Sequence, residues 1–320
     1  MIKVQEKFFR EEVDPILEVY KDKLIKNLME NEQKLENQIL SSLELIANNI
    51  NEDKNFKVKY IDISLPRISI LNEKYEIIVS AYDEGWYGGT SIDNIFTIEY
   101  VFDGLSDIRK DIYQKIKKYV GKITQHSVDY YILRQVPRYN QYLTYYFAKK
   151  LKQLDEEKSF NEMKKQKIMK IYYGEYKDSK RMVYKYEKIK KSKEKFIEAL
   201  NDDKEINLIF SQWVELKADK IDIANKDLTC MNLKKAKLKN IEISSCKCAG
   251  MNFRKSEIEK CHFKNCDLTV SDFSEGILQD VVFDNCNLRS VDFKDVKMVN
   301  VYFIEQDKKY ELKCKKKEGE

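Results

Sequence analysis

Residues 253–273 read FRKSEIEKCHFKNCDLTVSDF, and every fifth residue of this stretch, starting with Phe253, is large and apolar. The column continues in both directions, from Ile223 to Phe303, and all of its members are apolar. A period of five fits neither the turn of an α-helix, about 3.6 residues, nor the two-residue alternation of a strand. Some other regular structure must therefore turn every fifth side chain inward.

A second column lies two positions before the first and consists mostly of small or apolar residues. Cysteine packs as a compact hydrophobe at such positions. Five of the seven cysteines fall in the two columns: Cys246, Cys248, Cys261, Cys266 and Cys286. We expect the core of this region to contain Phe253, Ile258, Phe263, Leu268, Phe273, Leu278, Phe283, Leu288, Phe293, Met298 and Phe303.

The units at 266–270 and 291–295 begin Cys-Asp-Leu and Val-Asp-Phe, and they resemble the A(D/N)LXX motif of the pentapeptide-repeat family. The resemblance covers residues 221–303, about a quarter of the chain. It implies an all-β C-terminal region, a right-handed quadrilateral β-helix of about four coils. In that family each unit forms one side of a square coil, and the two inward columns fill the interior and leave no room for a ligand.

Residues twenty apart would stack in such a coil. This predicts one ladder of Phe253, Phe273 and Phe293 and a second ladder of Phe263, Phe283 and Phe303. The Asn or Asp of the motif is missing from several units, among them those of Leu238, Leu278, Phe283 and Met298. Because Lys226 also stands in the small-residue column, we expect the first coil to be irregular.

The chain before and after the repeats predicts a multidomain protein. Residues 1–155 indicate an α+β domain with a long N-terminal helix over the first fifty residues, antiparallel strands at 58–65, 75–82 and 95–102, and helices at 105–120 and 141–154 with Pro137 in a first turn. Residues 156–220 read as a Lys/Glu/Tyr-rich helical connector, with a strand at 180–186, a helix at 187–200, and a segment at 206–216 that caps the first coil. Residues 221–305 form the β-helix and 306–320 a basic tail.

Composition excludes several classes of protein. The chain has 59 basic and 54 acidic residues, a net charge of +5, which is a small excess for a generic polyanion binder. No apolar run approaches the roughly 20 residues that a membrane span needs. No secretory signal is recognisable, so we expect a soluble cytoplasmic protein with reduced thiols.

Catalytic chemistry has no recognisable signature. His126 and His262 are the only histidines and do not suggest a triad or a metal pair. There is no glycine-rich phosphate loop, and the cysteine spacing does not match a common zinc motif. We therefore expect no enzyme activity, no cofactor and no metal.

Two aromatic segments are candidate binding sites. The first is the glycine-rich stretch 83–90, which contains Trp86 and Tyr87. The second, 130–150, interleaves tyrosines with Arg134 and Arg138 in the manner of single-stranded nucleic-acid platforms. The favoured interpretation is structural in both cases, a turn in the first and a buried helical stripe in the second.

The leading hypothesis is a non-catalytic protein-interaction or scaffolding module with an unidentified protein partner, and a homodimer is compatible with it. The resemblance implies an alternative, because some pentapeptide-repeat proteins are acidic rods that mimic duplex DNA and act on topoisomerases. Residues 221–305 carry about 13 acidic and about 13 basic side chains, so a dense negative field is missing. Nucleic-acid binding through the N-terminal domain is the other alternative, and it is not favoured.

Overall fold

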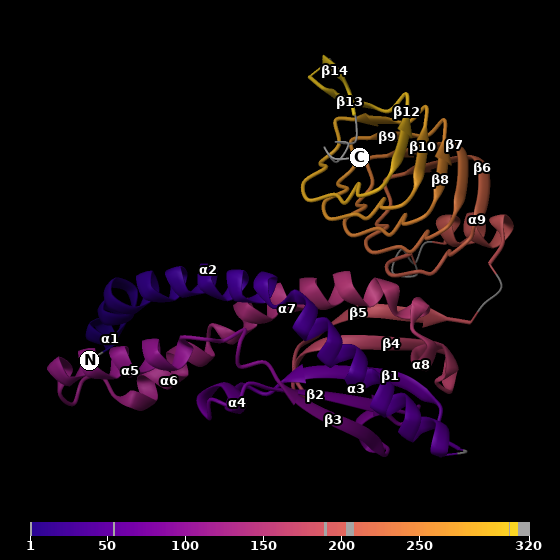
Figure 1. Ribbon diagram of the computed structural model, residues 1–320. Coiled ribbons are helices and arrows are strands. Elements are labelled where there is room, and N and C mark those ends of the chain that lie inside the picture. Colours follow the sequence, from indigo (N-terminus) through magenta and orange to yellow (C-terminus); the bar gives the residue numbers. More distant parts are fainter. Residues whose placement is uncertain (1, 54, 189–190, 203–207, 307, 313–320) are drawn as a thin grey trace, which may run out of the picture. The chain divides into compact units, whose positions relative to one another are not determined.

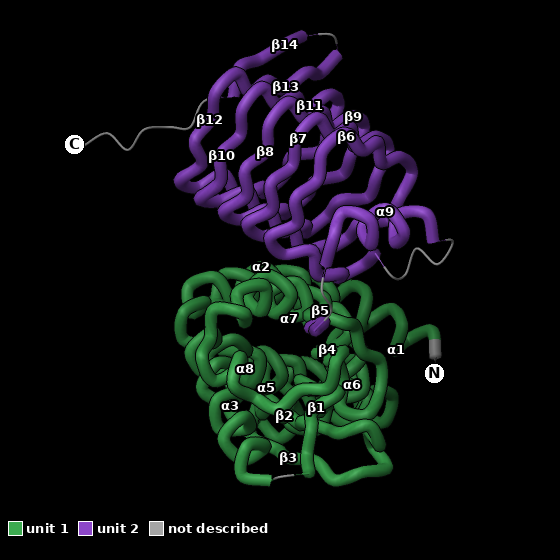
Figure 2. The backbone as a smooth tube through the Cα atoms, turned by 90° about the vertical axis from the view of Figure 1, so that its right-hand side faces the viewer, with its two compact units in different colours: residues 1–184 green, residues 185–320 purple. Residues whose placement is uncertain are grey.

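A computed structural model of the chain describes residues 2–53, 55–188, 191–202, 208–306 and 308–312. The chain divides into two compact units, residues 1–184 and 185–320 (Figure 2). The first unit is α+β and the second is a β-solenoid preceded by one helix, as the sequence predicts.

The helical elements of the first unit are α1 (Ile2–Phe8), the π-helical turn η1 (Phe9–Val13), α2 (Asp14–Glu30), α3 (Glu32–Glu52), α4 (Arg67–Leu71), the 3-10 turn η2 (Trp86–Gly88), α5 (Leu105–Ile116), η3 (Lys117–Tyr119), α6 (Gln125–Leu133), α7 (Val136–Lys150), η4 (Leu151–Glu156) and α8 (Lys158–Glu162). Its strands are β1 (Val58–Leu65), β2 (Glu76–Tyr82), β3 (Ser91–Thr97), β4 (Lys165–Glu175) and β5 (Lys180–Glu187), which runs on into the second unit (Figure 1).

The five strands form one sheet in the order β3-β2-β1-β4-β5. Helices α3 and α7 lie against one face of it (Figure 1). On that face the Asn94 amide donates to Ser42 Oγ at 2.9 Å, and the rings of Phe147 and Tyr173 stack 4.5 Å apart. The other face of β1 and β2 carries polar and aromatic side chains such as Asp62, and we call it the open face.

Several features of this unit differ from the prediction. The N-terminal helix is interrupted at Asn31, whose side-chain amide donates to the Asn27 carbonyl and competes with the helical hydrogen bonds. The third strand is residues 91–97 rather than 95–102, because residues 99–104 turn toward α5 and bury Val101 and Phe102.

The largest difference is β4, which was predicted to lie in a helical connector. It pairs in parallel with β1, and Ile61 lies opposite Ile171. Lysines at 165, 167 and 170 hide its strand pattern, and its partner lies about a hundred residues earlier in the chain. The boundary between the two units therefore follows residue 184 rather than residue 155.

The second unit contains α9 (Lys193–Asn201) and the strands β6 (Lys217–Ala224), β7 (Lys237–Ser244), β8 (Glu257–Glu259), β9 (His262–Lys264), β10 (Ile277–Gln279), β11 (Val282–Asp284), β12 (Lys297–Val299), β13 (Tyr302–Glu305) and β14 (Lys308–Glu311). Apart from the final antiparallel pair β13–β14, neighbouring strands are parallel and pair with a shift of twenty residues, as Leu278 does with Ile258 and Met298. One coil therefore consists of four five-residue sides.

The phenylalanine ladders are present in the interior. The rings of Phe253 and Phe273 stack 4.5 Å apart, and those of Phe263 and Phe283 stack 5.1 Å apart. Rings of the two ladders meet edge to face, for example Phe263 and Phe273 at 6.1 Å. Both arrangements are favourable for aromatic pairs.

The corners of the coils explain the spacing of the repeat. The residue two positions after each column member from Ile223 to Met298 has a positive φ, for example 53° at Asn265 and 50° at Asn285. Asparagine tolerates this left-handed conformation better than most residues. Val270 also adopts it, with a φ of 57°, although the conformation is unfavourable for a β-branched residue. A left-handed residue in every unit turns the chain by one side of the square.

The Asn or Asp of the motif has a local role on two of the four sides. Its side-chain oxygen accepts a hydrogen bond from the N–H two residues later, as Asp272 does from Ser274 at 2.9 Å. The other two sides are extended strands. The units of Leu238, Leu278, Phe283 and Met298, which lack Asn or Asp, lie in these strands, namely β7, β10, β11 and β12. The first coil is regular and β6 pairs with β7 along its length, so the expectation of an irregular first coil is wrong.

The solenoid begins earlier than residue 221. Phe210 and Glu215 continue the series of left-handed corners, and the Trp213 N–H donates to the Asn232 carbonyl one coil later. Residues 208–216, expected to be a cap, are therefore part of the first coil, and residues 206 and 207 of that segment lie outside the described residues. The cap is α9, whose Phe196 ring packs edge to face on Trp213 at 4.9 Å.

Candidate functional site

The interior of the solenoid is filled. Phe253, Phe263, Phe273 and Phe283 are almost completely buried, whereas Leu288, Phe293, Met298 and Phe303 are partly exposed at the C-terminal end. The remaining predicted core residues, Ile258, Leu268 and Leu278, are buried. The interior therefore holds side chains and leaves the outer surface for partners.

The cysteines of the small-residue column satisfy backbone groups. Cys266 and Cys286 donate from Sγ to carbonyl oxygens of the preceding coil, those of Ile243 and Phe263, at 3.3 Å. Burial raises the pKa of the Cys261 thiol to about 11, so this thiol stays protonated at neutral pH. In the described part of the chain, His, Cys, Asp and Glu side chains do not gather in groups of three that could hold a metal ion.

One outward side of the solenoid combines paired charges with exposed apolar side chains. It consists of 237–239, 257–259, 277–279 and 297–299, and we call it the lysine–glutamate face. Lys237 pairs with Glu257 and Lys239 with Glu259, each at 2.9 Å. In the next two coils, the same sheet surface presents Ile277 and Val299, which are 41% and 53% exposed.

The Trp86–Tyr87 segment is a tight turn against the open face of the first unit. Asp83 Oδ1 accepts a hydrogen bond from the Gly85 N–H at 2.8 Å. A Cβ on Gly89 would lie 2.7 Å from the same oxygen, so a larger residue there would displace the Asp83 side chain. The Trp86 ring lies over Tyr60, with centroids 3.8 Å apart.

Tyr87 belongs to a partly buried polar cluster that the sequence did not reveal. Its hydroxyl donates to Asp62 Oδ2 at 3.1 Å, and the Lys180 ammonium donates to both the Asp62 carboxylate and the Tyr87 hydroxyl. Asp62 is 1% exposed, and its Oδ1 has no hydrogen-bond partner among the described residues. Burial raises the pKa of the Tyr87 hydroxyl, as does the adjacent carboxylate.

A glycine allows Lys180 to reach this cluster. A Cβ on Gly174 would lie 2.2 Å from the Ser179 carbonyl oxygen and 2.8 Å from the Lys180 Cα, so only glycine permits β5 to approach β4 here. Sequence reasoning missed the cluster because Asp62 alternates with isoleucines as a solvent-facing strand residue would. Its partner Lys180 is 118 residues away.

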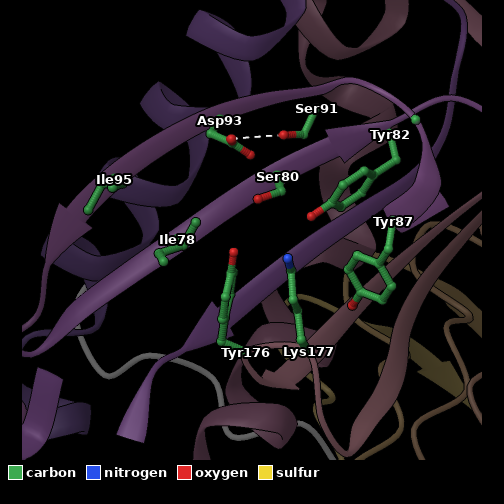
Figure 3. Close-up of a pocket in the computed structure, with 10 residues that line it drawn as sticks. Ile78, Ser80, Tyr82, Tyr87, Ser91, Asp93, Ile95, Tyr176 and Lys177 are labelled. Atoms are coloured by element: carbon green, nitrogen blue, oxygen red, sulfur yellow. Dashed lines mark hydrogen bonds between the residues drawn. The ribbon is translucent and has the colours of Figure 1, made fainter. Parts of the chain in front are cut away.

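A pocket of about 380 Å³ adjoins the Tyr87 ring on the open face. Its lining includes Ser80, Tyr82, Tyr87, Asp93, Tyr176 and Lys177. Figure 3 shows Tyr176 and Lys177 pointing from the turn after β4 toward β2. Among the described residues neither Asp93 nor Lys177 has an ion-pair partner, so both charges are available to a polar ligand.

The structure does not bring the two aromatic candidates together. Arg138 forms an ion pair with Glu18 of α2, and its second guanidinium nitrogen lies 3.1 Å from the carboxylate. Arg134 is exposed at the end of α6. Tyr139 and Tyr146 are buried, as the helical-stripe interpretation of 130–150 predicts.

Comparison with known proteins supports the description of the second unit as a repeat solenoid. A family model described as a pentapeptide repeat region matches residues 236–308. No curated protein matches the chain. Among the described helices, none is long and apolar enough to cross a membrane.

Solved structures that resemble part of the chain are also pentapeptide repeat proteins. One is HetL from Nostoc sp. strain PCC 7120, a pentapeptide repeat protein involved in heterocyst differentiation regulation; it is 15% identical with a TM-score of 0.24, and the match covers 27% of this chain and 44% of HetL. Another is Rfr23 from Cyanothece 51142, which is 12% identical with a TM-score of 0.18, and the match covers 28% of this chain and 62% of Rfr23. The chain thus spans less than half of HetL. The second unit is a pentapeptide-repeat solenoid by its family match and its coil register.

Proposed function

We propose that the protein is a non-catalytic interaction or scaffolding module that binds a protein partner on the lysine–glutamate face. The observation that carries the proposal is the pair of exposed apolar side chains, Ile277 and Val299, on a rigid sheet surface. Apolar groups surrounded by polar residues are typical of protein-binding patches.

The charged side chains of the lysine–glutamate face also favour a protein partner. Lys237 and Lys239 are already paired with Glu257 and Glu259, so the face offers little unpaired charge to a polyanion. Because exposed pairs are only marginally stable, a partner can rearrange them at small cost, about 0–1 kcal/mol each. We place the protein in the cytoplasm, since the described cysteines are free thiols.

Mimicry of DNA is the alternative. It requires a continuous negative surface, whereas on the lysine–glutamate face the glutamates of one coil are paired with lysines of the preceding coil. We therefore expect no inhibition or protection of a topoisomerase in supercoiling assays at about micromolar protein, and only weak, salt-sensitive retention of DNA in gel shifts. Topoisomerase inhibition below that concentration would replace the scaffold proposal with mimicry.

The proposal is tested with tagged full-length protein as bait in native lysate. The double variant Ile277→Lys, Val299→Lys places charges on the lysine–glutamate face without touching the interior. The matched control is Thr229→Lys, Thr269→Lys, on the opposite side of the coil. A specific partner should bind wild type and control equally and bind the face variant at least about tenfold more weakly, a change of about 1.4 kcal/mol. Equal capture by both variants would contradict this location of the site.

A further inference from the structure

β3 is an edge strand with free backbone groups. The Ile98 N–H donates to the Tyr75 carbonyl, and the pairing with β2 continues without a bulge. Since facing pairs alternate between bonded and non-bonded in an antiparallel ladder, Ile92, Asn94 and Phe96 direct their N–H and C=O groups toward β2. Residues 91, 93, 95 and 97 therefore direct theirs away from the sheet. No described residue provides a hydrogen-bond partner to the outward groups of residues 93 and 95.

β3 also lacks the protection that the other edge strands have. Charged side chains, especially lysine, discourage strand addition at an edge. Among the described strands, β5, β6, β12 and β14 lie at edges or ends of their sheets, and each contains at least one lysine. The sequence of β3, Ser-Ile-Asp-Asn-Ile-Phe-Thr, contains no lysine, arginine or proline. It is an edge suited to accept another strand.

Exposed apolar groups flank this edge on both sides of the sheet. Ile95 is 56% exposed on the open face. On the helical face, Gln38 of α3 donates to the outward carbonyl of Thr97 at 3.1 Å. Leu45 lies seven residues later on the same stripe of α3, and it is 53% exposed. A strand added to β3 would cover Ile95, and a helix beneath that strand would cover Leu45.

We infer that β3 pairs with β3 of a second copy, antiparallel about Asn94, so that two sheets join into one across a twofold axis. In this register residue 93 faces 95 and residue 91 faces 97, which are the positions with outward backbone groups. Ile92 faces Phe96 on the helical side, and Asp93 faces Ile95 on the open side. α3 of each copy lies under the new junction and supplies the Leu45 contact.

The strand is complementary to itself in this register. Centring the pair on residue 93 would place two aspartates opposite each other, which is destabilising. Centring it on residue 95 would shorten the paired segment from seven residues to five. An arrangement in which each copy uses the same patch is the geometry of a closed dimer, the commonest symmetric assembly.

The oligomeric state of the full-length protein tests the inference by light scattering coupled to gel filtration over a dilution series. We expect a dimer for wild type. Ile95→Pro removes an outward N–H, and proline is tolerated at an edge whose N–H faces solvent, so this variant should be a folded monomer. Leu45→Glu should weaken dimerisation at least about tenfold, because it places a carboxylate where the junction would cover an apolar side chain. The control Val19→Glu, at an exposed position of α2, should remain a dimer.

Cysteine crosslinking tests the register. Asn94→Cys would face its own copy across the axis and should form an intermolecular disulfide under mild oxidation. Ser91→Cys would lie roughly 20 Å from its counterpart and should form none beyond the wild-type background. A wild-type monomer at every concentration would overturn the inference and leave the edge to a strand of another protein. A dimer that survives both Ile95→Pro and Leu45→Glu would overturn it in favour of another interface.

Discussion

The two units are both built around β-strands, but they are stabilised by different kinds of contact. In the solenoid each strand pairs with residues twenty positions away, and the same packing is repeated in every coil. In the first unit the central contact joins β1 to β4 across about a hundred residues and occurs once. A repeated contact leaves a periodic record in the sequence, whereas a contact made once does not.

The buried polar groups differ in the same way. Those of the solenoid include hydroxyls and thiols that donate to the preceding coil, as Ser271 does to the Cys248 carbonyl at 2.9 Å. Those of the first unit include an ion pair, Asp62 with Lys180, supported by one tyrosine. The first arrangement is neutral and local, and the second depends on the whole sheet being assembled.

The largest expected effect is in the solenoid. Phe273→Asp would place a charge between the stacked rings of Phe253 and Phe293, with no partner to neutralise it. We expect a loss of at least about 5 kcal/mol, which unfolds the coils. Far-UV circular dichroism and thermal melting measure it. Arg289→Asp, at an exposed position, is the control, and an unchanged melting temperature for Phe273→Asp would contradict the packing described.

The ion pair of the first unit comes next. Lys180→Met leaves the Asp62 carboxylate buried and unpaired, at a cost of about 4 kcal/mol. The double variant Asp62→Leu, Lys180→Met removes both charges and should recover most of that loss. The comparison is made by urea unfolding in a Trp213→Phe background, followed by the fluorescence of Trp86, because the chain has two tryptophans. If the single and double variants were equally unstable, burial of the charge would not be the cause.

The cap should have a smaller effect. Phe196→Ala removes the ring that packs on Trp213 and leaves a cavity at the first coil, so we expect a loss of about 3 kcal/mol. Ile197→Ala, at the neighbouring half-exposed position, should cost much less. Hydrogen exchange of the β6 amides reports the difference, and equal protection in the two variants would rule out α9 as the cap.

The smallest effect is the pH dependence of the Arg138–Glu18 contact. The hydrogen bond from Arg138 lowers the pKa of Glu18 from 4.5 to about 2. A depressed carboxyl pKa contributes stability that is present above about pH 4.5 and is lost as the pH falls toward 2. Arg138→Gln should therefore flatten the decline of the melting temperature in that range. If the melting temperature of the variant falls with pH as steeply as that of wild type, the Arg138–Glu18 pair does not stabilise the packing of α2 against α7. Arg138 would then be available for a binding role.

The sequence by itself determined the solenoid, because each five-residue unit contains the features that specify one side of a coil. These are an inward apolar residue, a small residue two positions before it, and a left-handed corner that Asn tolerates. It also identified α2, α3, α5 and α7 of the first unit and the neighbouring strands β1 and β2, whose patterns depend on local periodicity, but not α6. The predicted start of the solenoid was too late for the same reason. Trp213 and Leu208 pack in the solenoid core and continue the five-residue spacing, but the residues around them do not match the motif.

Only the tertiary structure decided which strands share the first sheet, where the units divide, and that Asp62, Tyr87 and Lys180 meet. A lysine-rich strand such as β4 becomes a strand because β1 provides its hydrogen-bond partners, and no property of residues 165–175 encodes that partner. The same holds for the free edge of β3. Whether a strand is central or at an edge depends on what lies beside it in space, and periodicity along the chain contains no information about that neighbour.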